Sequence, residues 1–411
     1  MRVALITAGS RGDVAPFTGL GHGLVREGHD VTLVTHETFA GLAREAGLRF
    51  HGLPVDPQAE LRTERGRQLL ASRSGPGKLA RMLAMARRLV GAMAPGMLDA
   101  ARAADVLLLS GSVAPLGRAI ADGLGIASRG VYLQPLAPTA AFPPPVIGIR
   151  SYGRAGNRLA ARVVDSALHL TFAEAARHMR SALGGTRSRR RERRNWPVHH
   201  GFSPLVVPRP ADWRPGLTIG GYWWPYVSPA AALSDEVHAF LDAGPAPVFV
   251  GLGSPTVPDP ERMSDLLVRA LRAAGLRGVI QSGWSGLGAD GDDMLTIGEA
   301  PHSLLFPRMA AVVHHAGAGT TAAALRAGVP AVPVPVWFDG AFWSSRLTAL
   351  GVSPGAVPLR TLTTPDALAA ALTAAVRDPS YRRQATAVAE RLRREDGVAP
   401  VRAALDALDR G

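Results

Sequence analysis

The chain has 411 residues, of which 47% are hydrophobic and 19% are charged, so it holds enough apolar material for sizeable cores and is not a disordered chain. It has no cysteine, which excludes disulfides, thiol nucleophiles and cysteine-ligated metal sites. The 46 basic residues outnumber the 33 acidic ones, so the chain should attract acidic ligands such as nucleotides. No aromatic-rich or helix-turn-helix pattern points to nucleic acid, which favours a small molecule over a nucleic acid.

Short apolar runs alternate with helical patterns along the first half of the chain. The opening residues MRVALITAGSRGDV read as a buried strand rather than a signal peptide, and no run of about 18 apolar residues indicates a membrane span, so we expect a cytoplasmic protein. Strands are predicted at 3–7, 31–35, 48–53, 106–109 and 130–134. The helices between them are predicted at 16–26, 38–46 and 79–104. Short continuous apolar strands between helices are typical of a parallel sheet covered on both faces.

The alternation stops in the middle of the chain and then restarts. A proline-rich segment at 136–149 precedes a long predicted helix at 151–183, and prolines flank several aromatic residues between 203 and 229. Further strands are predicted at 247–251, 278–282, 294–297, 311–314 and 331–336, with a helix at 261–274 and a helical tail at 365–409.

This pattern predicts an α/β fold of two doubly wound units that face a cleft. The predicted units are residues 1–207 and 230–385, joined by a linker at 208–229. The helical tail at 386–411 is expected to pack back toward the first unit. The sequence holds no signal for an oligomeric state.

The residues MAAVVHHAGAGTT at 309–321 carry the strongest chemical signal. An apolar strand ends at the pair of histidines, small residues follow, and a helix begins near Thr320. Unpaired backbone N–H groups and the helix dipole at such a start favour a phosphate. Gly317 and Gly319 let the backbone come close to it, while His315 and Thr320 can donate hydrogen bonds.

Two other interpretations of this turn stay open at this point. It could be merely a tight connection between a strand and a helix. It also matches the dinucleotide fingerprint G-x-G-x-x-A over 317–322, with Asp339 about twenty residues further on. However, three predicted strands of the second unit precede it, whereas a dinucleotide domain carries its fingerprint after the first strand.

Several segments resemble the family 1 nucleotide-sugar glycosyltransferases, and most closely their bacterial sterol- and antibiotic-type branch. HHAGAGTT at 314–321, AGVPAVPVP at 327–335 and FDG at 338–340 resemble the donor-binding signature of that family. APHSLLFP at 300–307 is similar to its base-contacting segment, and GSRGDV at 9–14 looks like the opening loop of that branch.

The resemblance implies a GT-B fold, in which an N-terminal acceptor-binding domain and a C-terminal donor-binding domain face a cleft. It implies inverting, metal-independent transfer of a sugar from a UDP- or TDP-sugar to a hydroxyl of a lipophilic acceptor. Such acceptors are polyketides, macrolides, sterol-like or aromatic natural products. Because the nucleotide sugar is a substrate, neither a cofactor nor a metal is expected.

The resemblance also implies which residues hold the donor. The donor-binding set is Ser10, Arg11, Gly12, Ser254, Ala300, His302, His315, Gly317, Ala318, Gly319, Thr320, Asp339 and Gly340. Within it, the turn at 315–320 would hold the diphosphate. The backbone of Ala300 and the side chain of His302 would meet the nucleoside base. Ser254 would line the phosphate or ribose, and Asp339 would bind sugar hydroxyls.

Asp13 is the candidate general base. A hydroxyl that attacks the anomeric carbon must lose its proton to a base within hydrogen-bond reach. Asp13 follows the first strand, at the edge where ligands of such sheets bind, and the matching aspartate has this role in the resembled branch. His22 is the rival base, one to two turns into the predicted helix, and Asp13 could instead cap that helix near Pro16.

The chain departs from the family pattern at two positions. Gly340 stands where the family usually has glutamine, so we hypothesise a deoxygenated or otherwise unusual donor sugar, or compensation by another residue such as Trp337. Glu299 stands where plant members have a tryptophan that stacks on the base, which leaves uridine and thymidine both open.

Each of two charged segments could be either a binding site or a solvated surface loop. Asp290-Gly-Asp-Asp293 resembles a metal-binding DxD motif, but its glycine-rich surroundings favour a solvated loop. The arginine run at 187–194 could contact an anionic membrane or an acidic acceptor, or it could be a solvated loop. Two alternatives to a glycosyltransferase are a sugar-nucleotide epimerase or hydrolase, and a non-catalytic nucleotide-sugar-binding subunit.

Overall fold

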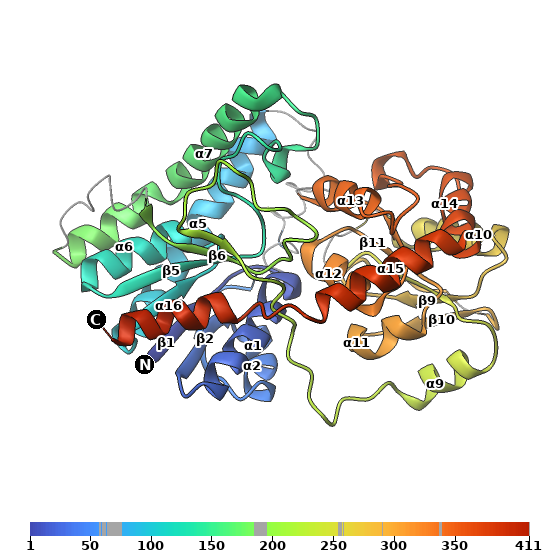
Figure 1. The fold of residues 1–411 in the computed structure, drawn as a ribbon, viewed down its shortest axis with the longest axis horizontal. Coiled ribbons are helices and arrows are strands. Elements are labelled where there is room, and N and C mark those ends of the chain that lie inside the picture. The colour runs from blue at the N-terminus through green and yellow to red at the C-terminus, as the bar shows by residue number, and fades with distance from the viewer. Residues whose placement is uncertain are drawn as a thin grey trace.

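The protein consists of two α/β units that lie side by side (Figure 1). The computed structural model describes residues 1–56, 59, 63, 76–184, 195–253, 257, 259–289, 291–336 and 339–410. The predicted α/β class with two doubly wound units is confirmed.

The N-terminal unit is built on a seven-stranded parallel sheet in the order β3-β2-β1-β4-β5-β6-β7. Its strands are β1 (Arg2–Ile6), β2 (Asp30–His36), β3 (Arg49–Leu53), β4 (Val106–Leu109), β5 (Ala127–Tyr132), β6 (Val198–His200) and β7 (Leu217–Ile219). Its helices are α1 (Arg11–Arg26), α2 (Ala40–Glu45), α5 (Pro76–Arg102), α6 (Ala114–Leu124) and α7 (Gly153–Ala182), with short 3-10 helices η1 (Glu37–Phe39) and η2 (Pro145–Ile147).

The alternation of side chains along β1 explains why both faces of this sheet are covered. Ala4 and Ile6 belong to a core shared with α5 and α6, whereas Val3 and Leu5 belong to a second core with α1. Successive strand residues point to opposite faces, so a continuous apolar run needs a layer of helices on each side.

The C-terminal unit repeats this plan around five parallel strands in the order β10-β9-β8-β11-β12. They are β8 (Val248–Gly251), β9 (Gly278–Gln281), β10 (Met294–Ile297), β11 (Ala311–His314) and β12 (Ala331–Pro333). The helices in this half of the chain are α9 (Asp235–Asp242), α10 (Pro260–Ala273), α11 (His302–Leu305), α12 (Ala318–Ala327), α13 (Gly340–Ala349), α14 (Asp366–Arg377), α15 (Pro379–Leu392) and α16 (Ala399–Asp409), with η3 (Phe306–Arg308) and η4 (Leu359–Thr361). None of the described helices is long and apolar enough to cross a membrane.

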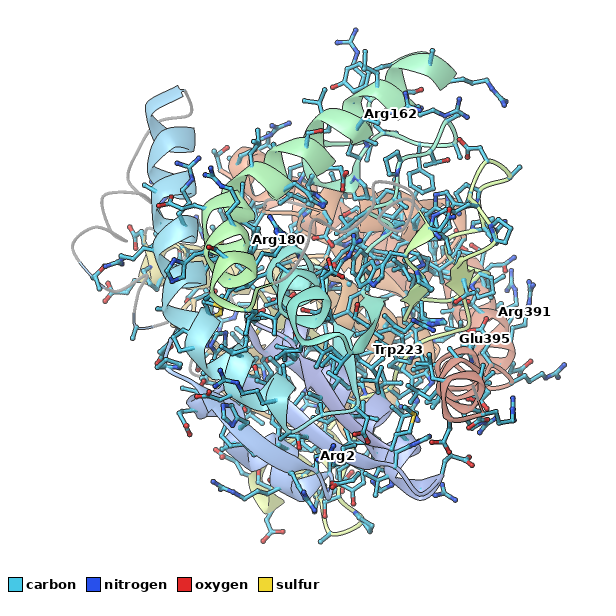
Figure 2. All side chains as sticks on the ribbon, turned by 90° about the vertical axis from the view of Figure 1, so that its left-hand side faces the viewer. Arg2, Arg162, Arg180, Trp223, Arg391 and Glu395 are labelled. Atoms are coloured by element: carbon cyan, nitrogen blue, oxygen red, sulfur yellow. The ribbon has the colours of Figure 1, made fainter. Side chains whose placement is uncertain are left out.

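The chain crosses between the units twice. The segment after β7 leads into the C-terminal unit, and α16 returns to the N-terminal unit, where Val401 and Leu405 are buried in its core (Figure 1). The two crossings touch each other, because Trp223 Nε1 donates to the Gly397 carbonyl at 2.8 Å. Figure 2 labels Trp223 and, in the segment that precedes Gly397, Glu395. β7 lies inside the segment that we expected to be a linker and extends the first sheet.

Candidate active site

The turn between β11 and α12 is held in one conformation by its own backbone. Ala316 has a φ of 61°, in the left-handed region that residues with a side chain rarely adopt. Its N–H donates to His314 Nδ1 at 3.1 Å, which stabilises this conformation. Gly317 then forms the N-cap of α12 without a side-chain cap from the described residues. The first N–H groups of α12 therefore have no intrahelical partner and suit an anion.

His315 is packed between two glycine backbones at this turn. A Cβ atom at Gly317 would lie 2.4 Å from His315 Nε2, and one at Gly253 would lie 2.6 Å from His315 Cε1. Burial lowers the pKa of His315 to about 4, so the imidazole is neutral near pH 7 and has one N–H to donate. Its Nδ1 is buried and has no hydrogen-bond partner among the described residues. The ring is therefore a positioned hydrogen-bond donor rather than a fixed positive charge.

On the opposite side of the cleft, Asp13 lies in the first turn of α1. The predicted helix start at residue 16 is wrong, because α1 begins at Arg11 with Ser10 as its N-cap. Asp13 Oδ2 accepts from the backbone N–H of Ser10 at 2.9 Å and from Ser10 Oγ at 3.0 Å. Burial raises the pKa of Asp13, while the two hydrogen bonds from Ser10 act in the opposite direction. Asp13 thus caps the helix and presents a carboxylate whose affinity for a proton is increased.

The N-termini of α1 and α12 contact each other where the two units meet. A Cβ atom at Gly319 would lie only 3.8 Å from the Gly12 carbonyl oxygen. Next to this contact, Arg11 Nη1 pairs with Glu299 Oε2 at 2.8 Å and so links the two units. Gly12 of the opening loop and Gly319 of the turn, which are both predicted site residues, are therefore neighbours in space although 307 residues apart in the chain.

Asp339 faces the same space as Asp13. It forms the N-cap of α13, and its Oδ2 accepts from Trp343 Nε1 at 2.7 Å. Burial, chiefly, and the negative charge of Asp13 raise the pKa of Asp339, while hydrogen bonds from Trp343 and Gln134 lower it. Gln134 follows β5, so this interaction comes from the N-terminal unit. Two carboxyl groups with raised pKa values therefore lie near each other where the two units meet, which is typical of functional sites.

The segment predicted to meet the nucleoside base lies next to the turn predicted to hold the diphosphate, residues 315–320, which is called the phosphate turn below. His302 opens α11, and its ring stacks on Phe306 with centroids 4.2 Å apart and lies 5.5 Å from the Phe249 ring. Burial lowers the pKa of His302 to about 4, so this imidazole is also neutral. Ala300 precedes it and is half-buried.

The rival base His22 lies elsewhere on α1. Its Nδ1 is 3.0 Å from the Ala46 carbonyl oxygen, and its ring lies 4.6 Å from that of Tyr226. Nine residues separate it from Asp13, which corresponds to about 13 Å along a helix. Other predicted residues, Ser254, Trp337, Asp290 and the arginine run at 187–194, lie outside the described residues.

Metal-binding side chains do not gather at the DxD-like loop within the described chain. Asp293 is held by Arg272, with Nε–Oδ2 and Nη2–Oδ1 distances of 2.8 and 2.9 Å. Among the described residues, no three His, Asp or Glu side chains are grouped so that they could hold a metal ion.

The sequence did not reveal that the segment after β5 contacts the C-terminal unit. Residues 136–149, here called the strap, leave the ligand edge of β5 and reach the C-terminal unit. Ring centroids of Phe142 in the strap and Phe342 in α13 are 5.3 Å apart. The strap therefore connects the carboxyl end of β5 with α13, whose N-cap is Asp339.

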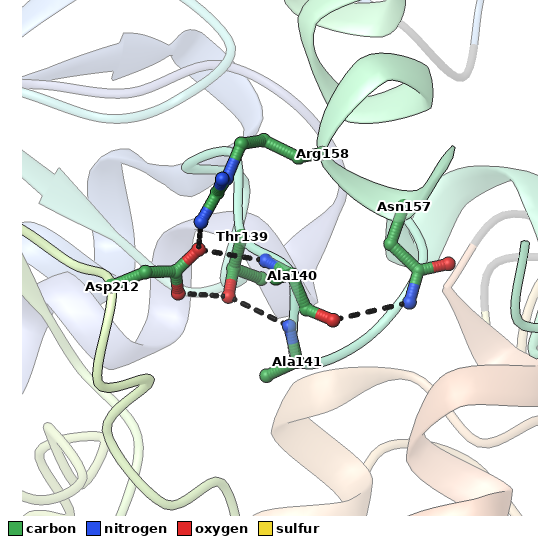
Figure 3. A network of polar contacts seen from close by, with 6 residues as sticks. All are labelled: Thr139, Ala140, Ala141, Asn157, Arg158 and Asp212. Atoms are coloured by element: carbon green, nitrogen blue, oxygen red, sulfur yellow. Dashed lines mark hydrogen bonds and ion pairs between the residues drawn. The ribbon is translucent and has the colours of Figure 1, made fainter. Parts of the chain in front are cut away.

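Asp212 fixes the strap (Figure 3). Its carboxylate accepts from Thr139 Oγ1 at 2.6 Å, from the Ala140 N–H at 2.8 Å and from Arg158 Nη2 at 2.7 Å. These bonds lower the pKa of Asp212 to about 2 against the effect of burial. Because 73 residues separate Asp212 from Thr139, no local sequence pattern could have indicated the contact.

Two family models match separate parts of the chain. The C-terminal domain of erythromycin biosynthesis protein CIII-like proteins matches residues 283–405, and the glycosyltransferase family 28 N-terminal domain matches residues 3–97. The first match contains the phosphate turn and Asp339, and the second contains Asp13.

Two curated relatives align with almost the whole chain. An O-mycaminosyltylonolide 6-deoxyallosyltransferase of Streptomyces fradiae is 36% identical over 421 residues, which cover 97% of this chain and 95% of the relative. A sterol 3-beta-glucosyltransferase of Arabidopsis thaliana is 30% identical over 419 residues, which cover 97% of this chain. The chain spans 64% of the length of this plant relative.

Solved structures share the fold along their whole length. The glycosyltransferase VinC, in complex with DTDP, matches with a TM-score of 0.69 and 19% identity, covering 100% of both chains. The spinosyn rhamnosyltransferase SpnG matches with a TM-score of 0.66 and 19% identity, covering 98% of this chain and 99% of that one. With these matches, the chain belongs to the GT-B glycosyltransferases of the family 28 and erythromycin CIII-like group, related to sterol and natural-product glycosyltransferases.

Proposed function

We propose that this protein transfers a sugar from a UDP- or TDP-sugar to a hydroxyl of a lipophilic natural-product or sterol-like acceptor, with inversion at the anomeric carbon. The observation that carries the proposal is the meeting of two helix N-termini at one cleft. One of them offers free N–H groups, and the other offers the carboxylate of Asp13. The names of the relatives, a deoxyallosyltransferase and a sterol glucosyltransferase, support this class of donor and acceptor.

In the proposed reaction, Asp13 accepts the proton of the acceptor hydroxyl while its oxygen attacks the anomeric carbon. A carboxylate with a raised pKa is a better proton acceptor than an exposed one. The bond between the anomeric carbon and the diphosphate breaks, and the negative charge that develops on the leaving group is stabilised at the start of α12. The neutral His315 and the hydroxyl of Thr320 supply further hydrogen bonds. Helix N–H groups can balance this charge, so the proposal needs no metal.

The donor sugar is proposed to be a deoxysugar. Gly340 has no side chain that could bind a sugar hydroxyl, and the space around it is small. A Cβ atom there would lie 3.1 Å from the His315 carbonyl oxygen and 3.3 Å from Pro335 Cβ. A larger side chain at this position would press on the phosphate turn. The Streptomyces relative, by its name, transfers a 6-deoxysugar, which agrees with this proposal.

The test is turnover by the purified chain with a panel of UDP- and TDP-sugars and a mixed library of hydroxylated natural products, read by mass spectrometry. We expect an acceptor mass increase by one deoxyhexose residue. A strong preference for UDP-glucose would overturn the deoxysugar assignment. Release of nucleoside diphosphate without any acceptor would instead indicate a hydrolase, and binding without turnover would indicate a non-catalytic subunit.

A further inference from the structure

One peptide group after β1 is held by side chains that come from both neighbouring strands. On one side, the Gly9 N–H donates to His36 Nε2 at 3.0 Å, and His36 is the last residue of β2. On the other side, the Ala8 carbonyl oxygen accepts from Ser112 Oγ at 2.8 Å, and Ser112 follows β4. Because β1 lies between β2 and β4, the peptide group that joins Ala8 to Gly9 is fixed at both of its polar atoms.

This peptide group supports the side chain of Asp13. Gly9 has a φ of 145°, which glycine adopts more readily than any other residue. A Cβ atom at Gly9 would lie 2.4 Å from Asp13 Oδ2 and 2.8 Å from its Cγ, so the carboxyl group packs directly on this backbone. Ser10 comes next and donates its N–H and its hydroxyl to the same Oδ2. The position of Gly9 therefore sets the position of the carboxyl group and of both its donors.

His36 can accept from this N–H only as a neutral ring whose proton is on Nδ1. A backbone N–H can only donate, so the nitrogen that faces it must carry a lone pair. The ring is 1% exposed, and its centroid lies 6.3 Å from that of Phe39. Burial lowers the pKa of His36, while the backbone of Val55 and the charge of Asp56 act in the opposite direction. Burial thus favours the neutral form that the hydrogen bond requires.

We propose that His36 is a positioning residue for the general base. Its hydrogen bond to Gly9, together with that from Ser112, keeps residues 8–10 where the Asp13 carboxyl group can face the acceptor hydroxyl. Among the described residues, both hydrogen bonds from Ser10 reach Oδ2, which leaves Oδ1 to take the proton. The inference rests on the proposed role of Asp13 and adds to it a residue that acts through Gly9.

The test compares two substitutions of His36 in the purified full chain. His36→Gln keeps an acceptor oxygen near the place of Nε2, whereas His36→Leu keeps the bulk of the side chain without an acceptor. We expect His36→Leu to lower kcat about tenfold or more, because a base displaced by about 1 Å works far less well. His36→Gln should stay within about threefold of the wild type. Calorimetry with TDP should give nearly the same affinity in both variants, because the diphosphate is proposed to lie at α12.

The fall of kcat/KM toward acid pH separates a positioning role from a merely structural one. The hydrogen bonds from Ser10 act on the pKa of Asp13 against burial, which raises it. When His36→Leu lets Ser10 move away, this pKa rises further, so activity should be lost at a higher pH than in the wild type. In His36→Gln the profile should stay in place. Asp339, the other carboxyl group that interacts with Asp13, is the same in every variant.

A second variant and a control keep the test independent of the folding of His36→Leu. Ser112→Ala removes the other hydrogen bond at an exposed residue, and it should lower kcat about threefold with a shift of the profile in the same direction. His29→Leu replaces a half-buried histidine just before β2, at the far end of that strand, and should keep the wild-type kcat. Circular dichroism verifies that each variant is folded.

Hydrogen exchange of the amides at 7–14, read by mass spectrometry without any substrate, should quicken in His36→Leu but not in His36→Gln. Unchanged exchange and kcat in His36→Leu would overturn the inference, provided that Asp13→Asn is inactive. Equal losses of kcat in the leucine and glutamine variants would overturn it as well, since the acceptor atom would then not matter. Full turnover by Asp13→Asn would instead overturn the proposed role of Asp13 itself.

Discussion

The two helices that meet at the cleft begin in different ways. α1 begins with a side-chain cap, in which the Asp13 carboxylate accepts two hydrogen bonds from Ser10. α12 begins at Gly317 without a side-chain cap from the described residues, so its first N–H groups are available to a ligand. α1 follows the first strand of its unit and α12 follows the fourth strand of the other, and the two helix starts supply opposite chemistry. One edge holds a carboxylate, and the other is prepared to hold an anion.

The largest expected effect comes from removing the carboxylate of Asp13, at the start of α1. Asp13→Asn keeps an oxygen that can accept from Ser10 but cannot take a proton, so we expect kcat to fall about 100-fold or more. Binding of TDP or UDP, measured by calorimetry, should change little, because the diphosphate lies at the other helix. A variant that keeps its kcat within a few-fold of the wild type would exclude Asp13 as the base.

Ser10→Ala is the matched control for the capping role of Asp13. It removes the hydroxyl that donates to Asp13 Oδ2 but retains the carboxylate. We expect it to lower the free energy of unfolding by about 1 kcal/mol while retaining far more turnover than Asp13→Asn. Equal losses of kcat in both variants would mean that the cap, and not the base, matters.

A single methyl group added at Gly317, at the start of α12, should weaken nucleoside diphosphate binding. Gly317→Ala places a Cβ atom 2.4 Å from His315 Nε2, so either the ring or the turn must move. We expect the affinity for the nucleoside diphosphate to fall about tenfold or more, as judged by calorimetry. In Gly319→Ala the nearest atom is 3.8 Å away, in Gly12, so the His315 ring is undisturbed and the loss should be smaller. The reverse order would contradict the packing described for His315.

The buried histidines and the buried carboxyl groups should also respond to pH in opposite directions. Burial lowers the pKa of His302 and His315 to about 4 and that of His314 to about 3. The unfolded chain therefore binds protons first, and these groups make stability fall as the pH drops from about 6.5 toward 4. The raised pKa values of Asp13 and Asp339 have the opposite sign, since they lower stability as the pH rises.

Urea denaturation at several pH values measures this contrast. In His315→Asn the acid-induced loss of unfolding free energy should be smaller than in the wild type, by about 2 kcal/mol between pH 6.5 and pH 4. An unchanged pH dependence would show that His315 is not buried in its neutral form.

Residues that act within one local segment could be predicted, and those that act between segments could not. β1 and β11 are continuous apolar runs, and the glycines at 317 and 319 follow β11 directly, so the pattern alone indicated a phosphate turn. β6 and β7 have three residues each and lack a clear apolar run, which is why the sheet continues into the predicted linker. Proline is favoured in the first turn of a helix, so Pro16 suggested too late a start for α1.

The role of Asp212 depends on contacts that only the folded chain brings together, and it gives a smaller predicted effect. In Asp212→Asn the hydrogen bonds to the strap lose their charge, and the pair with Arg158 at 2.7 Å is lost. We expect KM for the acceptor to rise about threefold to tenfold, while donor affinity and kcat change less. The control is Asp242→Asn, which removes an exposed ion pair with Arg308 far from the strap. Equal effects of the two substitutions on KM would show that the strap does not line the acceptor site.

The smallest expected effect concerns the ion pair between Arg11 at the start of α1 and Glu299, which lies between β10 and α11 of the C-terminal unit. Arg11 and Glu299 are 2.8 Å apart, but 47% and 69% of their side-chain surface is exposed. Water and salt screen such pairs, so a double-mutant cycle with Arg11→Ala and Glu299→Ala should give a coupling of about 0.5 kcal/mol in unfolding. Because the pair joins the two units, the same cycle measured on donor affinity should give a larger coupling if the units close on the nucleotide. A coupling near zero in both measurements would mean that the cleft is held by the strap and the crossing segments alone.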